Sequence, residues 1–220
     1  MTWKWIVGVL ATVTLLFGTV WLVWFSSVMG VKSVTVAGTG YLSADEVRAA
    51  AGVPMDEPLA RLDLASIEGR VAALAPVKSV DVRRVWPDAV AVKIEERTAV
   101  AVVSIGGQVR GLDDEGVVFR TFARKPRELP LVQADPEART EAIAESAAVV
   151  SAMPADLARR VDHVEVRTPD EITLVLRNGR TVLWGSADQS ELKARVLVAL
   201  LSQRGREYDV SVPGQPRVSG

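Results

Sequence analysis

The chain has 220 residues with 26 basic and 27 acidic side chains, a single histidine and no cysteine. So balanced a charge argues against nucleic-acid binding, which needs a basic surface. The absence of cysteine excludes disulfides and cysteine-based zinc sites, and a lone His163 excludes metal motifs built on two histidines. The length allows one or two domains, and the composition offers little equipment for catalysis.

The first predicted element is a membrane-spanning helix over residues 5–28. No charged residue occurs between Lys4 and Lys32, a run longer than the ~20 residues that cross a bilayer. Tryptophans lie towards both ends, as in interfacial aromatic belts. A cleaved signal peptide has a shorter apolar core of about 7–15 residues, so we expect this segment to stay attached. Residues 1–4 would be a short tail, although the charge bias that sets orientation is weak.

A strand–helix–helix–strand–strand order follows. The strand VKSVTVAG precedes a helix that Ser43 and Glu46 open as a capping box, with Gly52 placed to end it. A second helix follows Asp63, because apolar residues recur there at helical spacing, and it stops at Pro76. The pattern predicts a small α/β module.

Two alternating runs, VKSVDVRR and VAVKIEER, then flank a Trp-Pro-Asp turn and predict a hairpin. We expect Trp86 and Pro87 to be structural, with the Trp86 ring packed over the rim of the sheet. Glu96 and Arg97 stand where the first module gives way to the second. We interpret this charged cluster, together with Glu95, as a junction that sets the angle between the two halves.

The second half predicts a mixed sheet with two helices. Strand patterns occur in AVAVVSI and QVRGL around Gly106-Gly107, in VVFRTF, and in VDHVEVR, EITLVLR and TVLWGS, the last two joined by Asn178-Gly179. One helix is expected to open at Asp135-Pro136 and end at Pro154. The other starts near Asp188, with Glu191 completing a capping arrangement. EYDVSVP is predicted to be the last strand, and residues 214–220 are predicted to be a disordered tail.

Three segments could be taken for active or ligand-binding sites. Asp113, Asp114 and Glu115 form a tight carboxylate cluster, but the following Gly116 favours a hairpin turn. His163 has no nucleophile or carboxylate beside it in a recognisable motif. The GTGY stretch at 38–41 lacks the spacing of either phosphate-binding glycine motif, which favours a turn. We therefore predict no catalytic residue, no cofactor and no metal site.

The order of elements and the block VWPDAVAVKIEER resemble the FtsQ/DivIB family of bacterial cell-division proteins. VKSVTVAGTGYLSADEVRAAAGV and LDDEGVVF are similar to that family as well. The resemblance implies an α+β protein with an N-terminal transmembrane helix, a βααββ POTRA domain over 31–98 and a C-terminal β domain over 99–213. It also implies a cell-division (divisome) scaffold in the plasma membrane at the septum, with the N-terminus cytoplasmic and the rest extracytoplasmic. Its partners would be FtsB/DivIC and FtsL.

The last strand is the predicted docking edge for an FtsB-like partner. As the final element it would have one side free, and a free edge offers backbone hydrogen-bonding groups to an incoming strand. We expect the site to comprise Tyr208, Asp209, Val210, Ser211 and Val212, with basic contacts from Lys193, Arg195 and Arg204. The alternative is that the side chains of Tyr208, Val210 and Val212 simply fill the core.

Two other functions compete. A POTRA-containing accessory protein of membrane-protein assembly or secretion needs a long series of alternating strands, and only about 120 residues follow the POTRA segment. A membrane-tethered enzyme needs a nucleophile, base or metal constellation that the sequence does not offer. We also expect no small-molecule substrate and no nucleic acid, with membrane lipid and other division proteins as the remaining partners.

Overall fold

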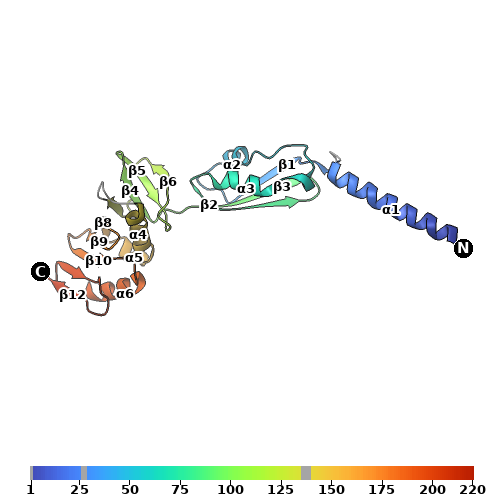
Figure 1. Cartoon of the computed structure of the whole chain (residues 1–220). Helices are drawn as coiled ribbons and strands as arrows, with labels where there is room; N and C mark the ends of the chain where they lie inside the picture. Colours follow the sequence, from blue (N-terminus) through green and yellow to red (C-terminus); the bar gives the residue numbers. More distant parts are fainter. Residues whose placement is uncertain (1, 26–28, 135–139) are drawn as a thin grey trace. The chain divides into compact units, whose positions relative to one another are not determined.

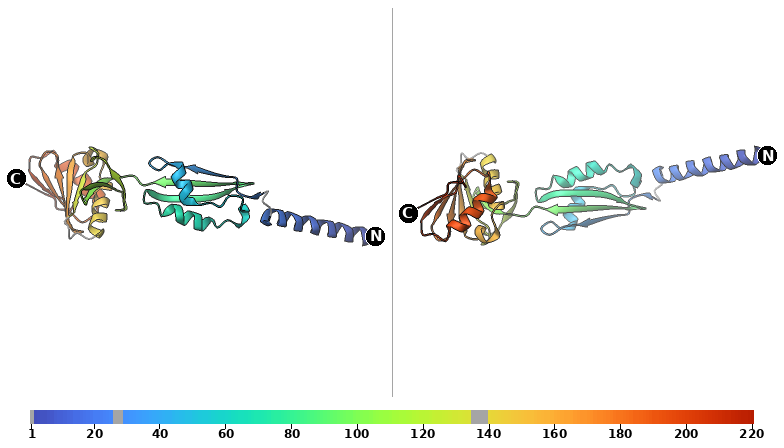
Figure 2. Two further views of the ribbon diagram at one scale, coloured as in Figure 1. Left: turned by 90° about the horizontal axis from the view of Figure 1, so that it is seen from above. Right: turned by 90° about the horizontal axis from the view of Figure 1, so that it is seen from below.

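The computed structural model describes residues 2–25, 29–134 and 140–220. The chain divides into two compact units, Met1–Glu96 and Arg97–Gly220. Figures 1 and 2 show a small sheet with its helices in the first unit and a large sheet with its own helices in the second. The predicted α+β class is confirmed.

Helix α1 covers Thr2–Phe25, and the large apolar side chains that the structure describes in it are exposed. Three threonine hydroxyls, those of Thr12, Thr14 and Thr19, donate to carbonyls one turn earlier, which satisfies them within the helix. Within the described residues, no helix combines the length and the apolar character that crossing a membrane requires. The structure therefore does not show the predicted span over 5–28, and residues 26–28 lie outside the described residues.

The first unit has the predicted βααββ order, with one short 3-10 turn between the helices. The elements are β1 (Ser33–Ala37), α2 (Ala44–Ala51), η2 (Leu59–Arg61), α3 (Leu64–Ala72), β2 (Val77–Val85) and β3 (Ala89–Glu96). The sheet order is β1-β3-β2, with β1 parallel and β2 antiparallel to β3. One face of β3 (Val90, Val92 and Ile94) is buried against the helices, as its alternation predicts.

Local chemistry explains where these helices begin and end. The Ser43 hydroxyl accepts from the Glu46 amide and the Glu46 carboxylate accepts from the Ser43 amide, so the predicted capping box is confirmed. The Ser43 hydroxyl also donates to the Glu46 carboxylate, and this bond, with the one from the Ser43 amide, keeps the pKa of the Glu46 carboxyl below its usual value. Gly52 ends α2 in the left-handed region, at φ 52°. The Asp63 carboxylate caps α3 by accepting from the Ser66 amide at 3.1 Å.

The second unit is built on one sheet of nine strands. Its elements are β4 (Ala101–Ile105), β5 (Gln108–Leu112), β6 (Val118–Phe122), β7 (Leu131–Ala134), α4 (Thr140–Ser151), α5 (Ala155–Ala158), β8 (Val161–Thr168), β9 (Glu171–Leu176), β10 (Thr181–Gly185), α6 (Ser190–Leu200), β11 (Glu207–Asp209) and β12 (Arg217–Ser219). The strand order is β12-β11-β10-β9-β8-β7-β4-β5-β6. The two glycine-containing hairpin turns stand where the sequence places them.

Several details of this unit differ from the sequence expectations. Strand β7 and the four-residue helix α5 have no counterpart among them. The expected helix start at Asp135-Pro136 lies outside the described residues. Helix α6 begins at Ser190, after Gln189, and no side chain caps it, so the capping arrangement of Asp188 and Glu191 is wrong. Gln189 adopts a positive φ of 55°, which starts the helix later than the sequence indicates.

Trp86 is also not where we expect it. It stands in the turn between β2 and β3 with 52% of its surface exposed, and Pro87 beside it is exposed too. The prediction that the ring packs over the rim of the sheet is therefore wrong. Smaller residues, among them those on the buried face of β3, form the core of this unit, and Trp86 is not one of them.

Candidate functional site

Strand β11, the predicted docking edge, is paired on both sides. It runs parallel to β10, with Tyr208 opposite Val182, and antiparallel to β12, with Tyr208 opposite Val218. The prediction that β11 has a free edge is therefore wrong, because β12 comes from the tail that we expect to be disordered. In the described part of the chain, β12 forms this end of the sheet.

Close packing explains why the tail is ordered. A Cβ atom built on Gly205 would lie 2.3 Å from Cγ1 of Val218, so only a glycine lets β12 approach. Val218 is partly buried against the main core of the unit. The Arg206 amide donates to the Ser219 carbonyl at 2.9 Å, and the Gln215 amide closes a turn onto the Val212 carbonyl at 2.9 Å. These contacts hold a strand that has only one apolar side chain.

The side chains of Tyr208 and Val210 belong to the core, with 1% and 0% of their surface exposed. The Tyr208 hydroxyl donates towards the Gln203 carbonyl at 2.9 Å and accepts from the Arg180 guanidinium at 3.0 Å. The Val210 amide donates to the Leu183 carbonyl at 3.0 Å. These two residues fix β11 in the sheet, so the core alternative describes their side chains.

The other three residues of the predicted edge lie in or after β11. The Asp209 carboxylate accepts from the amide and the hydroxyl of Ser211, at 2.9 and 2.6 Å, which turns the chain away from the strand. Val212 is 59% exposed and is the residue of this group whose side chain faces solvent most. Asp209 and Ser211 thus shape the turn that leads to β12.

Lys193 does not form part of a basic surface. It is 2% exposed, and its ammonium group donates to the Ser186 carbonyl at 2.9 Å, which ties α6 to the loop after β10. Burial lowers the pKa of Lys193 below its ordinary value, although Asp188 opposes this effect. Lys193 lies on the buried face of α6, with Ala194 and Leu197. Arg195 and Arg204 are exposed, as the sequence predicts.

A basic cavity that the sequence analysis missed lies at the β9–β10 turn. Its volume is about 220 Å³, and four of its seven lining residues are arginines, namely Arg159, Arg160, Arg177 and Arg180, with no acidic residue among them. Arg177 donates to two carbonyls and Arg180 donates to the Leu201 carbonyl and to Tyr208, whereas Arg159 forms an ion pair with Asp156. The four arginines come from two separate segments, which no spacing pattern joins.

Glu96 closes the GTGY loop of the first unit. Its carboxylate accepts from the amides of Gly40, Tyr41 and Leu42 at 2.9, 2.7 and 2.9 Å. Gly38 opens the same loop at φ 87°, and a Cβ atom there would lie 1.9 Å from the Ile94 carbonyl oxygen. The loop does bind an anion through backbone amides, and that anion is a side chain of the same unit.

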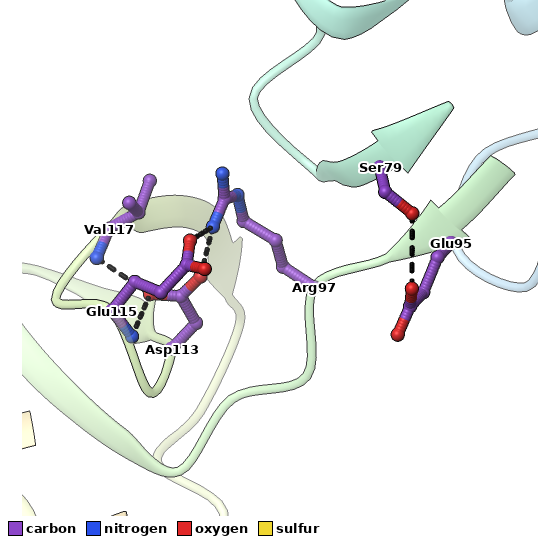
Figure 3. A network of polar contacts seen from close by, with 6 residues as sticks. All are labelled: Ser79, Glu95, Arg97, Asp113, Glu115 and Val117. Atoms are coloured by element: carbon purple, nitrogen blue, oxygen red, sulfur yellow. Dashed lines mark hydrogen bonds and ion pairs between the residues drawn. The ribbon is translucent and has the colours of Figure 1, made fainter. Parts of the chain in front are cut away.

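Arg97 binds within the second unit. Its guanidinium pairs with Asp113 and, at 2.7 Å, with Glu115, and Figure 3 shows both carboxylates converging on it. Asp113 is fully buried and also accepts from the amides of Glu115 and Val117, at 3.1 and 2.7 Å. Desolvation disfavours the charge of Arg97, but the hydrogen bonds to Glu115 and Asp113 outweigh it and raise the pKa of Arg97.

The DDEG segment is therefore the predicted hairpin turn, and its first carboxylate is also a buried partner of Arg97. Glu95 and Ser79, drawn in the same view, are bonded across β2 and β3 at 3.0 Å and belong to the first unit. His163 is half-buried on β8, with Nδ1 3.0 Å from Asp162 and Nε2 3.4 Å from Glu165. The hydrogen bond to His163 lowers the pKa of Asp162.

Comparison with known proteins covers both units. A family model described as POTRA domain, FtsQ-type, matches residues 29–97. A second, described as Cell division protein FtsQ/DivIB, C-terminal, matches residues 101–212. A solved structure of the major extracytoplasmic domain of DivIB from Geobacillus stearothermophilus is 17% identical and covers 49% of this chain and 93% of its own, with a TM-score of 0.41.

Curated relatives called "Cell division protein FtsQ" align over most of the chain. The relative from Streptomyces bingchenggensis is 40% identical over 220 residues, which covers 95% of this chain and 83% of the relative. That from Streptomyces coelicolor is 36% identical and covers 98% of this chain and 87% of the relative. Since the models match both units and the relatives match nearly the whole length, this chain belongs to the FtsQ/DivIB family of cell-division proteins.

Proposed function

We propose that this chain is a non-enzymatic scaffold of the bacterial division machinery. It recruits and links other division proteins at the septum and in this way regulates septal peptidoglycan synthesis. Membership of a family whose curated relatives carry a cell-division name supports this role. The partners proposed are FtsB/DivIC and FtsL, with further division proteins at the POTRA domain.

The observation that carries the proposal is the edge position of β12. Arg217 and Ser219 of this strand are exposed, and β12 stands at the end of the nine-stranded sheet. A strand from an FtsB-like partner adds to this edge through backbone hydrogen bonds. The proposed partner site is thus on β12 and not on β11, where the sequence analysis placed it. Tyr208 and Val210 are buried core residues next to it.

The arginines of the β9–β10 turn supply the charge complementarity. Arg180 immediately precedes Thr181, which pairs with Glu207, and Glu207 pairs with Ser219. The basic cavity thus lies on the β10 side of β11, two strands from the C-terminal end of β12. Acidic side chains of the partner strand contact these arginines, in addition to the exposed Arg195 and Arg204.

We further propose that residues 5–28 anchor the chain in the plasma membrane, with the N-terminus in the cytoplasm and both units outside. The large apolar side chains of α1 that the structure describes are exposed. The sequence carries no charge between Lys4 and Lys32. Extraction of membranes with alkaline carbonate should leave the full-length chain in the pellet. Amino-terminal sequencing should then read from residue 1 or 2, and a start near Met29 would contradict the anchor.

A photo-crosslinking experiment tests strand addition without disturbing the fold. A photoreactive amino acid is placed at Arg217 or Ser219 on β12, and in the control at Thr121, an exposed position on β6 at the other end of the same sheet. We expect FtsB to crosslink at the two β12 positions and not at Thr121. Equal crosslinking at Thr121, or none at β12 in a sample that binds FtsB, would contradict the proposal.

A further inference from the structure

Exposed apolar side chains of the first unit gather beside the turn between β2 and β3. Met55, Val85 and Trp86, called here the Trp86 cluster, are 53%, 46% and 52% exposed. Beyond α1, Tyr41 is the one other large apolar residue of this unit that is exposed, among the residues that the structure describes. Tyr41 lies at the opposite end of the sheet, in the loop that Glu96 binds. The apolar exposure is therefore concentrated at one end.

Backbone hydrogen bonds bring the cluster to the start of the unit. The Lys32 amide donates to the Asp88 carbonyl at 2.7 Å, next to Trp86. The Asp56 amide donates to the Val31 carbonyl at 2.9 Å, next to Met55. Residues 31 and 32 thus run between the two segments that carry the cluster. Figures 1 and 2 show the β2–β3 turn at the end of the sheet where β1 begins.

This end of the unit is tethered closely to α1. The helix ends at Phe25, and Lys32 is already bound beside the turn. Seven residues span at most about 25 Å when fully extended. The distance from the end of α1 to the cluster is therefore at most about this length plus the length of a side chain. If α1 is in a bilayer, the Trp86 cluster is within reach of the bilayer surface.

We propose that the Trp86 cluster contacts the interfacial layer of the membrane beside α1 and so rests the POTRA unit on the lipid surface. This inference depends on the membrane anchor proposed above. A lipid surface is the occupant that fits, because tryptophan favours the headgroup region, where its ring is among apolar groups and its N–H finds a partner.

The charges around the cluster point to the same kind of contact. Lys32 and Asp88 form an ion pair at 3.4 Å, so this cation is neutralised within the unit. Arg83 and Arg84 directly precede Val85, but Arg83 pairs with Asp81 at 2.7 Å and Arg84 donates to two backbone carbonyls of the same unit. Asp56 and Glu57 stand beside Met55. The contact therefore depends on apolar and aromatic area and not on attraction to anionic lipid. Its strength is expected to change little with salt.

Site-directed spin labelling of the full chain in lipid nanodiscs tests the inference. The natural sequence has no cysteine, so a single introduced cysteine takes the label alone. Met55→Cys reports on the cluster, Leu15→Cys on α1, and Ala37→Cys, exposed at the far end of β1, is the matched aqueous control. The readout is the accessibility of each label to oxygen, which concentrates in lipid, and to a water-soluble nickel chelate.

We expect the Leu15 label to be in lipid, the Ala37 label in water, and the Met55 label to be shielded from the nickel chelate to an intermediate degree. Adding Trp86→Ser to Met55→Cys should return that label towards the aqueous value, whereas raising the salt concentration should not. The substituted side chain is half-exposed, so the melting temperature should be unchanged and confirm that the unit is folded.

The possible failures are distinguishable. A Met55 label that is fully aqueous while the Leu15 label is in lipid overturns this inference and leaves the anchor intact. A Leu15 label in water overturns the anchor and the inference together. If the Met55 label is aqueous in nanodiscs and becomes shielded only when another division protein is added, the cluster is a protein-binding site and the lipid contact is wrong.

Discussion

Glu96 and Arg97 are neighbours in the chain, but their side chains bind in different units. The Glu96 carboxylate accepts hydrogen bonds from three backbone amides of the 40–42 loop in the first unit. The Arg97 guanidinium forms ion pairs with Asp113 and Glu115 in the second. The boundary between the two units falls between these two residues. Each residue thus has partners in its own unit, and the expectation that this charged cluster sets the angle between the units stays a prediction.

Glu96→Gln should destabilise the first unit by about 1–3 kcal/mol. A glutamine offers one acceptor oxygen where the carboxylate offers two, and its NH₂ group would face amides that also donate. Denaturation by urea measures the loss. Glu95→Gln is the control, because Glu95 is exposed on the neighbouring strand position and bonds only to Ser79 among the contacts described. Equal losses for both variants would show that the amide contacts contribute nothing specific.

Arg97→Gln should destabilise the second unit by about 3 kcal/mol, since removing one partner of a buried pair leaves the other charge uncompensated. Asp113 is fully buried and Arg97 has a side chain 15% exposed. A double-mutant cycle with Asp113→Asn isolates the pair from the two amide bonds that Asp113 also accepts. Additive losses in the double variant would contradict a direct coupling between the two side chains.

The fold of the first unit could be predicted because its signals are local. A capping box needs only two residues three positions apart, and a glycine at the C-terminus of a helix indicates by itself where the helix ends. The alternation of apolar residues in β3 predicts which face of the strand is buried. The exposure of Trp86 could not be predicted in the same way. Whether a large ring is buried depends on the volume left by residues distant in sequence, and the core closes without it.

In the second unit the missed features depend on partners far along the chain. Val218 is the only apolar residue of β12, and its place is provided by Gly205 and the edge of β11. The sequence predicts Asp113 only as a turn residue, because its ion pair with Arg97 forms in the folded unit. Lys193 lies on the buried face of α6 beside Ala194, and no local pattern predicts a lysine on that face. The arginines of the basic cavity are joined only by tertiary structure.

The stability of wild type relative to Lys193→Met should rise with pH on the alkaline side. Burial lowers the folded-state pKa of Lys193 below its unfolded value of 10.5. Between the two values the unfolded chain binds more protons than the folded chain, so stability increases with pH across that window. At pH values below the folded-state pKa, Lys193 is charged in both states, and the buried charge destabilises the folded chain by its full amount. Urea titrations at several alkaline pH values measure the difference.

Arg195→Met is the control for this measurement, because Arg195 is exposed on the same helix and an arginine keeps its charge over the whole range. The free-energy difference between wild type and Arg195→Met should stay constant with pH. If the difference for Lys193→Met also stays constant, the ammonium group is not desolvated in solution as it is in the structure.

Gly205→Ala tests whether β12 is held by the close approach of Val218. The added methyl group would lie 2.3 Å from Cγ1 of Val218 and 3.2 Å from the Ser219 carbonyl oxygen, so the strand must move. Because valine is branched at Cβ, its side chain cannot swing aside freely, and we expect a loss of about 1–3 kcal/mol. Hydrogen exchange should locate the effect at the β11–β12 pairing, with faster exchange at Arg206, whose amide donates to Ser219.

Val218→Ala in the same chain should restore part of the loss, because it removes the atom that meets the new methyl group. Gly214→Ala is the matched control, since a Cβ atom at Gly214 meets nothing within 4 Å. If β12 is also the partner edge, Gly205→Ala should lower FtsB crosslinking from Arg217, and the double variant should recover it. Unchanged exchange and unchanged crosslinking in Gly205→Ala would mean that β12 is not fixed by this contact, and the partner edge would then have to be sought on β11.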